Sequence, residues 1–253
     1  MPKNQNQPPQ QEGPQQQGRF QRWLGKVGIH FGQQGQHSEI VRRPATYREY
    51  IATFADNLAD VQQHFAELVV PLPDRTPAHL NRYKLIPLEV DDGEDGIPSN
   101  IEPGVKVTYV DRSGPQPLTE LFLDARRGVG LVYDNSLIAV AAGHVEADST
   151  LMITQLQDVT GVRREDNQRA YFRTGLHNGF SWRDTLVNVM EQVAVRSGVA
   201  AIGIQSYENS KWPEVIEAGP AGFDTVAQRM GYNPPQYNGD NWVKPTANIE
   251  PIV

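Results

Sequence analysis

The stretch LVYDNSLIAVAAGHVEADSTLMITQLQDV, residues 131–159, decides the fold of this chain. Apolar and β-branched residues dominate it, and Asp134 and Asn135 interrupt it where a tight turn is expected. The pattern predicts two strands within 130–146, one on each side of that turn, and a further strand over 150–159. Consecutive strands joined by short turns predict the antiparallel centre of a sheet.

Helices and strands alternate after this centre. Residues 181–198 predict a helix, because Ser181 is a suitable N-cap, apolar residues recur at helical spacing, and Gly198 stops it. The remaining elements are a buried strand over 199–207, a short helix over 222–232 and a last strand over 240–244.

Upstream of the centre, residues 105–111 alternate as a strand does. Residues 117–127 predict a helix, with Leu118, Leu121, Phe122 and Ala125 on one face.

A long helix over 46–70 is the clearest single element. Thr46 and Glu49 form a capping-box pattern, a stripe of apolar residues follows helical spacing, and prolines end it. A second, short helical segment is expected over 76–83.

Composition excludes several classes of protein. The 253 residues include no cysteine, so disulfides, thiolate metal sites and a cysteine nucleophile are excluded, and the histidines show no metal-ligand spacing. No apolar run has the roughly 18 residues of a membrane span, and no signal peptide begins the chain. We therefore expect a protein of the cytoplasm or of an intracellular particle, neither secreted nor bound to a membrane.

Charge divides the chain unevenly. Residues 1–43 carry a net charge of +4, and the rest carries −11. An acidic body does not suit binding to a phosphate backbone, so nucleic acid is expected to contact at most the basic tail.

The domain organisation follows from composition. Residues 1–18 are rich in Gln and Pro and are expected to be disordered. Residues 19–89 join a basic aromatic segment, 19–32, to the helical lead-in, and 90–104 read as an acidic linker. The main α/β domain is then 105–253. Segment 19–32 either docks on a partner assembly or packs on its own domain.

The order of elements over 105–244 resembles the GNAT superfamily of N-acyltransferases. Residues 131–159 resemble the three central antiparallel strands of that family. Residues 184–204, DTLVNVMEQVAVRSGVAAIGI, resemble its cofactor-side helix and the next strand, and FDTVAQRMGY (223–232) resembles its last helix. The implied fold is a mixed, largely antiparallel sheet flanked by helices.

The resemblance implies acetyl-CoA as cofactor, with no metal, and an amine as acyl acceptor. A strand that splays from its neighbour pairs with the pantetheine arm, and a helix N-terminus receives the diphosphate. The residues that match these positions are Gln157, Val159, Asn178, Gly179, Ser181, Arg183 and Asn209. The family's phosphate loop reads Gln/Arg-x-x-Gly-x-Gly/Ala, and this chain departs from it, with Arg183 at the last small position; a register two residues earlier, starting at Leu176, restores one glycine.

Acyl transfer requires a base for the amine and an acid for the departing thiolate. Asp158 and Glu146 are the candidate bases, and Tyr207 is the candidate acid because Ala227 stands where the family often has a tyrosine. These departures leave a second hypothesis open: a GNAT-like scaffold without catalysis, serving as a structural subunit of a larger assembly such as a virion or other particle.

Overall fold

The computed structural model describes residues 46–91, 95–107, 109–110, 117–118, 121–159, 176–206, 209, 223–236 and 240–252. They belong to one compact unit, Arg42–Val253. The expected disordered tail 1–18 and the segment 19–32 lie outside the described residues. Within the ranges given, no helix has both the length and the apolar content needed to cross a membrane.

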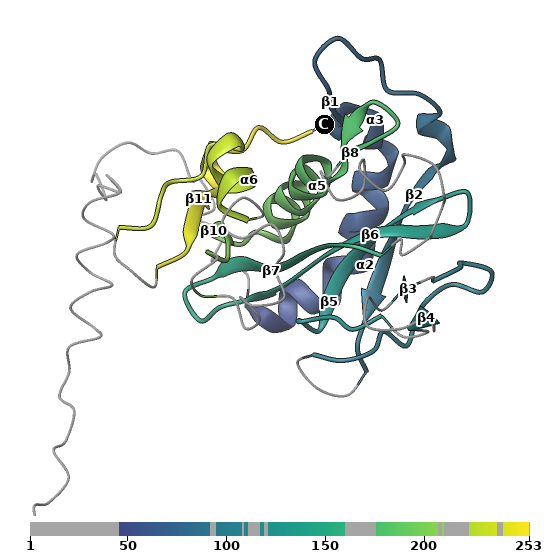
Figure 1. Cartoon of the computed structure of the whole chain (residues 1–253). Coiled ribbons are helices and arrows are strands. Elements are labelled where there is room, and N and C mark those ends of the chain that lie inside the picture. The colour runs from purple at the N-terminus through teal and green to yellow at the C-terminus, as the bar shows by residue number, and fades with distance from the viewer. Residues whose placement is uncertain are drawn as a thin grey trace, which may run out of the picture. The chain divides into compact units, whose positions relative to one another are not determined.

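A six-stranded sheet forms the centre of the unit (Figure 1), in the order β11-β10-β7-β6-β5-β2. Its strands are β2 (Tyr83–Glu89), β5 (Arg127–Tyr133), β6 (Ser136–Val145), β7 (Thr150–Asp158), β10 (Ala201–Ile204) and β11 (Trp242–Pro245). Neighbouring strands are antiparallel except for β7 and β10, which are parallel. The expected mixed α/β class with a largely antiparallel sheet and flanking helices is confirmed.

The expected turn joins β5 to β6. Asp134 and Asn135 have φ of 47° and 60°, the left-handed backbone that a two-residue hairpin requires. Further along, Ala142 pairs with Gln155 and Gly143 with Ile153. Thr154 therefore has no counterpart on β6, and this β-bulge bends β7 at that point.

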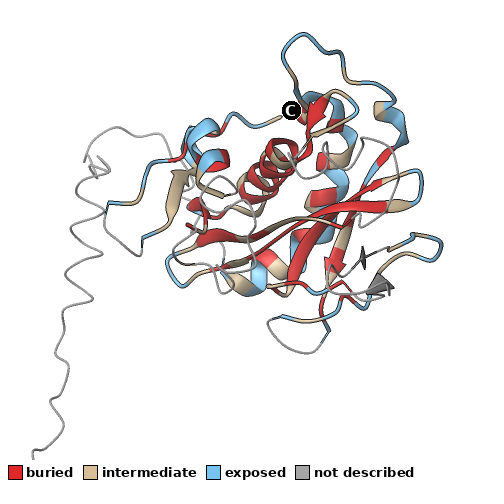
Figure 2. Cartoon of the chain, viewed as in Figure 1, coloured by how far each residue is buried: buried red, intermediate tan, exposed pale blue. Residues whose placement is uncertain are grey.

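Two long helices, α2 (Tyr47–Gln63) and α5 (Trp182–Ser197), cover one face of the sheet. The capping box of Thr46 and Glu49 is confirmed at the start of α2, and the short helix α3 (Phe65–Leu68) follows it. Most of α5 is buried (Figure 2), including polar residues, because α2 and the C-terminal elements pack around it. Those elements are α6 (Phe223–Arg229), β11 and the 3-10 helix η4 (Thr246–Asn248).

A small sheet, β1-β9-β8, lies at the N-terminus of α5. It consists of β1 (Val70–Pro71), β8 (Leu176–His177) and β9 (Phe180–Ser181). The 3-10 helix η1 (Leu80–Arg82) leads into β2.

A second core lies on the other face of the sheet, and none of the described residues in it belongs to a helix. Leu121, Leu123 and Ala125 cover this face together with residues from 90–107. The helix predicted over 117–127 is wrong. Buried Leu121, Leu123 and Ala125 alternate with exposed Phe122 and partly exposed Asp124, which is the period of an extended chain.

Within the predicted strand 105–111, the described residues contain β3 (Tyr109–Val110), which pairs with β4 (Pro117–Leu118), and a bridge between Lys106 and Ser136. The helix expected over 76–83 is present only as η1.

Strand β2 was not predicted. It pairs with β5 along its whole length, from Tyr83–Tyr133 to Glu89–Arg127. The domain boundary placed at 90–104 is therefore wrong, because residues before and after it share one sheet and one core.

Candidate functional site

The parallel strands β7 and β10 stop pairing halfway along β7. Their register runs from Thr150–Ala201 to Ile153–Ile204, where β10 ends and the bulge at Thr154 bends β7. Strand β7 continues to Asp158, and no strand in the described part of the chain pairs with this edge of Leu156–Asp158. We call this point the fork. In sheets with parallel strands, ligands bind at the carboxyl ends where neighbours diverge.

The loop expected to cradle phosphate is a tight hairpin turn instead. Asn178 and Gly179 have φ of 43° and 89° and join β8 to β9. The Gly179 carbonyl accepts a hydrogen bond of 2.9 Å from the Leu72 N–H, and the Asn178 carbonyl accepts one of 3.3 Å from Ala78. The Asn178 amide donates to the Tyr83 hydroxyl at 2.9 Å. Both predicted residues are thus engaged in holding this hairpin against the rest of the fold.

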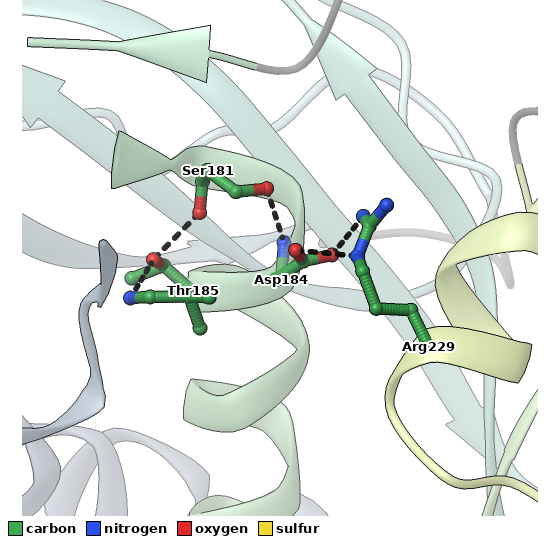
Figure 3. A network of polar contacts seen from close by, with 5 residues as sticks. Ser181, Asp184, Thr185 and Arg229 are labelled. Atoms are coloured by element: carbon green, nitrogen blue, oxygen red, sulfur yellow. Dashed lines mark hydrogen bonds and ion pairs between the residues drawn. The ribbon is translucent and has the colours of Figure 1, made fainter. Parts of the chain in front are cut away.

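Ser181 caps α5, as its sequence position predicts (Figure 3). Its hydroxyl accepts from the Asp184 N–H at 3.3 Å, and its carbonyl accepts from the Thr185 hydroxyl at 2.7 Å. Thr185 in turn accepts from the Val70 N–H at 3.1 Å. These contacts lock the first turn of α5 to β1.

A buried carboxylate shares this helix N-terminus. The side chain of Asp184 is 3% exposed, and Arg229 of α6 binds it with two nitrogens, the Nε–Oδ2 distance being 2.8 Å (Figure 3). The positive end of the α5 dipole favours the negative charge of Asp184. Sequence reasoning missed this pair, because the two residues are 45 positions apart and neither belongs to a motif.

Arg183 is the second cation at the fork. Its guanidinium lies 5.2 Å from the centre of the Trp182 ring. Burial lowers its pKa, the charges of Asp158 and Asp184 raise it, and Arg229 lowers it. Among the described residues it has no hydrogen bond or ion pair, so a half-buried, charged guanidinium is available to an anion.

The other predicted cofactor residues lie near the fork, and each of them already makes a hydrogen bond within the protein. The side chain of Val159 is fully buried, and its N–H donates to Ile138 at 2.9 Å. The Gln157 amide oxygen accepts from Gln155 at 2.8 Å, and the Asn209 amide donates to Asn241 at 2.8 Å.

The two candidate bases lie at opposite ends of the β6–β7 hairpin. Asp158 pairs with Ala139, whereas Glu146 follows the Val145–Leu151 pair. At about 3.3 Å per residue, about 20 Å separates them. Only Asp158 shares the fork with Arg183. Burial raises the pKa of Glu146, and Asp148 raises it further, but this carboxyl cannot act at the same centre. Tyr207 lies outside the described residues.

Three buried side-chain atoms without a hydrogen-bond partner come from the elements that meet at the fork. They are Thr154 Oγ1 on β7, Trp182 Nε1 on α5 and Ser206 Oγ just after β10. Buried polar atoms in folded proteins nearly always have a partner. The fork is therefore polar, with donors and acceptors that the described chain does not use.

No cluster of metal ligands accompanies these groups: across the described ranges, no three His, Asp or Glu side chains lie close enough together to hold a metal ion. No protein-family model matches this chain, and no curated protein matches it.

Proposed function

We propose that this chain is a GNAT-like protein that binds an acyl-CoA at the fork and transfers its acyl group to an amine. One observation carries the proposal: β7 leaves β10 at a bulge beside the N-terminus of α5, where Arg183 has no ion pair among the described residues. A strand edge that pairs with no other strand among the described residues, next to the guanidinium of Arg183, matches a ligand that has amides at one end and phosphates at the other.

The residues at the fork fit such a ligand. The backbone of Leu156–Asp158 offers hydrogen-bonding groups to the pantetheine amides, and the planar guanidinium of Arg183 suits a phosphate oxygen pair. The unpartnered atoms of Thr154, Trp182 and Ser206 add further polar contacts. When bound, acetyl-CoA supplies an activated acyl group as a thioester.

In this proposal Asp158 accepts the proton of the acceptor amine, because of the two candidate bases it is the one that lies at the fork. Its charge interacts with that of Arg183, so a phosphate bound by Arg183 changes the electrostatic environment of the base. Glu146 takes no part in this proposal.

A second candidate function, a GNAT-like scaffold without catalysis, is favoured by a different observation. Asp184 places a carboxylate at the α5 N-terminus, where a diphosphate would otherwise bind, and Arg229 already neutralises it. On this alternative the fork is a structural remnant, and the chain serves as a subunit of a larger assembly.

Calorimetric titration of the full chain with acetyl-CoA, and with CoA as a comparison, distinguishes the two functions. The proposal predicts micromolar binding that Arg183→Ala weakens by about tenfold or more. Arg48→Ala is the matched control, since Arg48 is exposed on α2 away from the fork, and binding should be unchanged. Absence of heat at millimolar acetyl-CoA would overturn the acyltransferase proposal and leave the scaffold.

A further inference from the structure

One tyrosine hydroxyl connects the central sheet to the β8–β9 hairpin. Tyr83 is the first residue of β2 and is 4% exposed. The Asn178 amide donates to the Tyr83 hydroxyl at 2.9 Å, and the same hydroxyl is paired with Nδ1 of His177. Two consecutive residues of the hairpin therefore share one anchor on the sheet.

The directions of these two hydrogen bonds follow from the groups involved. An amide N–H can only donate, so the hydroxyl oxygen of Tyr83 accepts from Asn178, and the hydroxyl proton remains for His177. Burial lowers the pKa of His177 to about 4, so the imidazole is neutral at pH 7 and its Nδ1 can accept a hydrogen bond from Tyr83. The hairpin thus uses both the donor and the acceptor of this hydroxyl.

The ring of Tyr83 supports the hairpin as well. It packs edge-on against the fully buried Phe180 of β9, with 5.2 Å between ring centres, and against His177 at 5.5 Å. Tyr133 of β5 and Phe65 of α3 contact the same ring, at 4.7 and 5.9 Å. Tyr83 therefore joins the hairpin to the sheet and to the helical layer that covers it.

The hairpin passes directly into α5, so its position sets that of the helix N-terminus (Figure 3). Ser181 is both the last residue of β9 and the N-cap of α5, and its hydroxyl accepts from the Asp184 N–H at 3.3 Å. Arg183 is the second residue of the helix, within the turn that Ser181 caps. A shift of the hairpin on the sheet therefore moves Arg183 relative to the edge of β7.

We propose that Tyr83 is a positioning residue for the cofactor site at the fork. By anchoring the β8–β9 hairpin, it holds the first turn of α5, and with it Arg183, where a phosphate of acyl-CoA binds. This inference rests on the proposed function. Tyr83 acts without touching the cofactor, since its hydroxyl is occupied by His177 and Asn178. A binding group that is held in place before the ligand arrives loses less conformational entropy on binding, so loosening the anchor lowers the affinity.

Tyr83→Phe in the full chain tests the inference, because it removes the hydroxyl and keeps the ring packing. Asn100→Ala is the matched control, since it removes side-chain hydrogen bonds from the other end of the same strand, at Pro87 and Glu89. Hydrogen–deuterium exchange without ligand should be about tenfold faster at amides of residues 182–185 in Tyr83→Phe, and at the parental rate in Asn100→Ala. Calorimetric titration with acetyl-CoA should show about fivefold weaker binding by Tyr83→Phe and unchanged binding by Asn100→Ala.

Asn178→Gly is a second variant in case Tyr83→Phe does not fold, which a melting curve checks. It removes one of the two hydrogen bonds to Tyr83, and glycine readily adopts the φ of 43° at this position. The same amides should exchange faster, by a smaller factor than in Tyr83→Phe.

Three results would overturn the inference: parental exchange at 182–185 in both hairpin variants, equally accelerated exchange along the whole of α5, or an acetyl-CoA affinity that Tyr83→Phe leaves unchanged. Absence of acetyl-CoA binding by the parent would instead overturn the proposed function. Because the exchange measurement needs no ligand, the two failures are distinguishable.

Discussion

Two strand edges of the same sheet differ in how their backbone hydrogen-bonding groups are satisfied. Along the outer edge of β2, the Leu85 N–H donates to the Gln62 side chain, and Pro87 has no N–H to satisfy. The Asn100 amide accepts from the Glu89 N–H at 2.7 Å and donates to the Pro87 carbonyl at 3.1 Å. Side chains thus replace a neighbouring strand.

Beyond Ile153, the edge of β7 has no such cover within the described residues, although it lies between the charged groups of α5 and the end of β10. Proteins usually protect strand edges because an unpaired edge recruits other chains. The contrast shows that side chains of this fold can satisfy the backbone groups of a strand edge, as they do at β2. The edge of β7 at the fork, which has no strand partner in the described part of the chain, is therefore the part of the sheet to examine for a ligand.

We expect the largest effect from a substitution that disrupts the β-bulge at the fork. A Cβ on Gly143 would overlap the carbonyl oxygen of Met152, which belongs to the backbone of β7 and cannot move aside cheaply. We expect Gly143→Ala to lower the free energy of unfolding by about 3 kcal/mol in urea denaturation. Gly104→Ala is the comparison, with open space around its Cβ but a φ of +91°, and should cost about 1 kcal/mol. Equal effects would mean that the bulge is not tightly packed.

Acidification should destabilise the fold at the start of β2, where His177 contacts Tyr83. His177 lies against the ring of Tyr83, and its Nδ1 is paired with the Tyr83 hydroxyl. Burial lowers the pKa of His177 to about 4, so the folded state binds fewer protons than the unfolded chain below pH 6.5. The contribution of His177 to the free energy of unfolding is complete above pH 6.5. It is lost as the pH falls towards 4, and the loss amounts to roughly 3 kcal/mol.

The measurement is urea denaturation between pH 7 and pH 4.5 for the parent and for His177→Gln. The parent should lose more of its free energy of unfolding over this range than the variant does. Parallel losses in the two proteins would show that His177 is not the titrating group.

Removing the cover of β2 should cost less. Asn100→Ala leaves the Glu89 N–H and the Pro87 carbonyl without their side-chain partner. Because this edge is near solvent, we expect a loss of about 1 kcal/mol. An increase in self-association, measured by sedimentation velocity, should accompany it. Ser99→Ala, which removes a longer hydroxyl contact of 3.4 Å, should change neither quantity.

We expect the smallest effect on stability from a substitution at the fork, that of Arg183. Arg183 has no ion pair or hydrogen bond in the described part of the chain, so Arg183→Ala should change the free energy of unfolding by no more than about 0.5 kcal/mol. Arg229→Ala should cost more, because it leaves the carboxylate of Asp184 buried without its partner. A large destabilisation by Arg183→Ala would show that this arginine has a structural role.

Local signals in the sequence predicted the elements that begin or end at a capping or turn residue. Thr46 with Glu49, the Asp134–Asn135 turn, and Ser181 with Gly198 each specify a cap or turn that the structure contains. Strand β2 was missed because the consecutive buried residues Leu85 and Ile86 break its alternation and Pro87 lies within it; pairing with β5 and the side-chain cover of its edge accommodate the proline.

The fork itself was only partly predictable. The candidate residues on β7 and α5 follow from the order of elements, but the bulge at Thr154 depends on the register with β6, which sequence spacing does not reveal. Asn178–Gly179 was assigned to a phosphate loop although this pair is a strong hairpin signal, and the hairpin is what formed. The Asp184–Arg229 pair required the tertiary fold.

Hydrogen–deuterium exchange of the full chain, with and without acetyl-CoA, tests the central claim most directly. We predict that those amides of residues 154–158 that do not bond to β6 exchange quickly in the free protein and become protected at saturating acetyl-CoA, while amides of 85–89 are protected in both states. Unchanged exchange at 154–158 under saturating acetyl-CoA would contradict the assignment of the fork as the cofactor site.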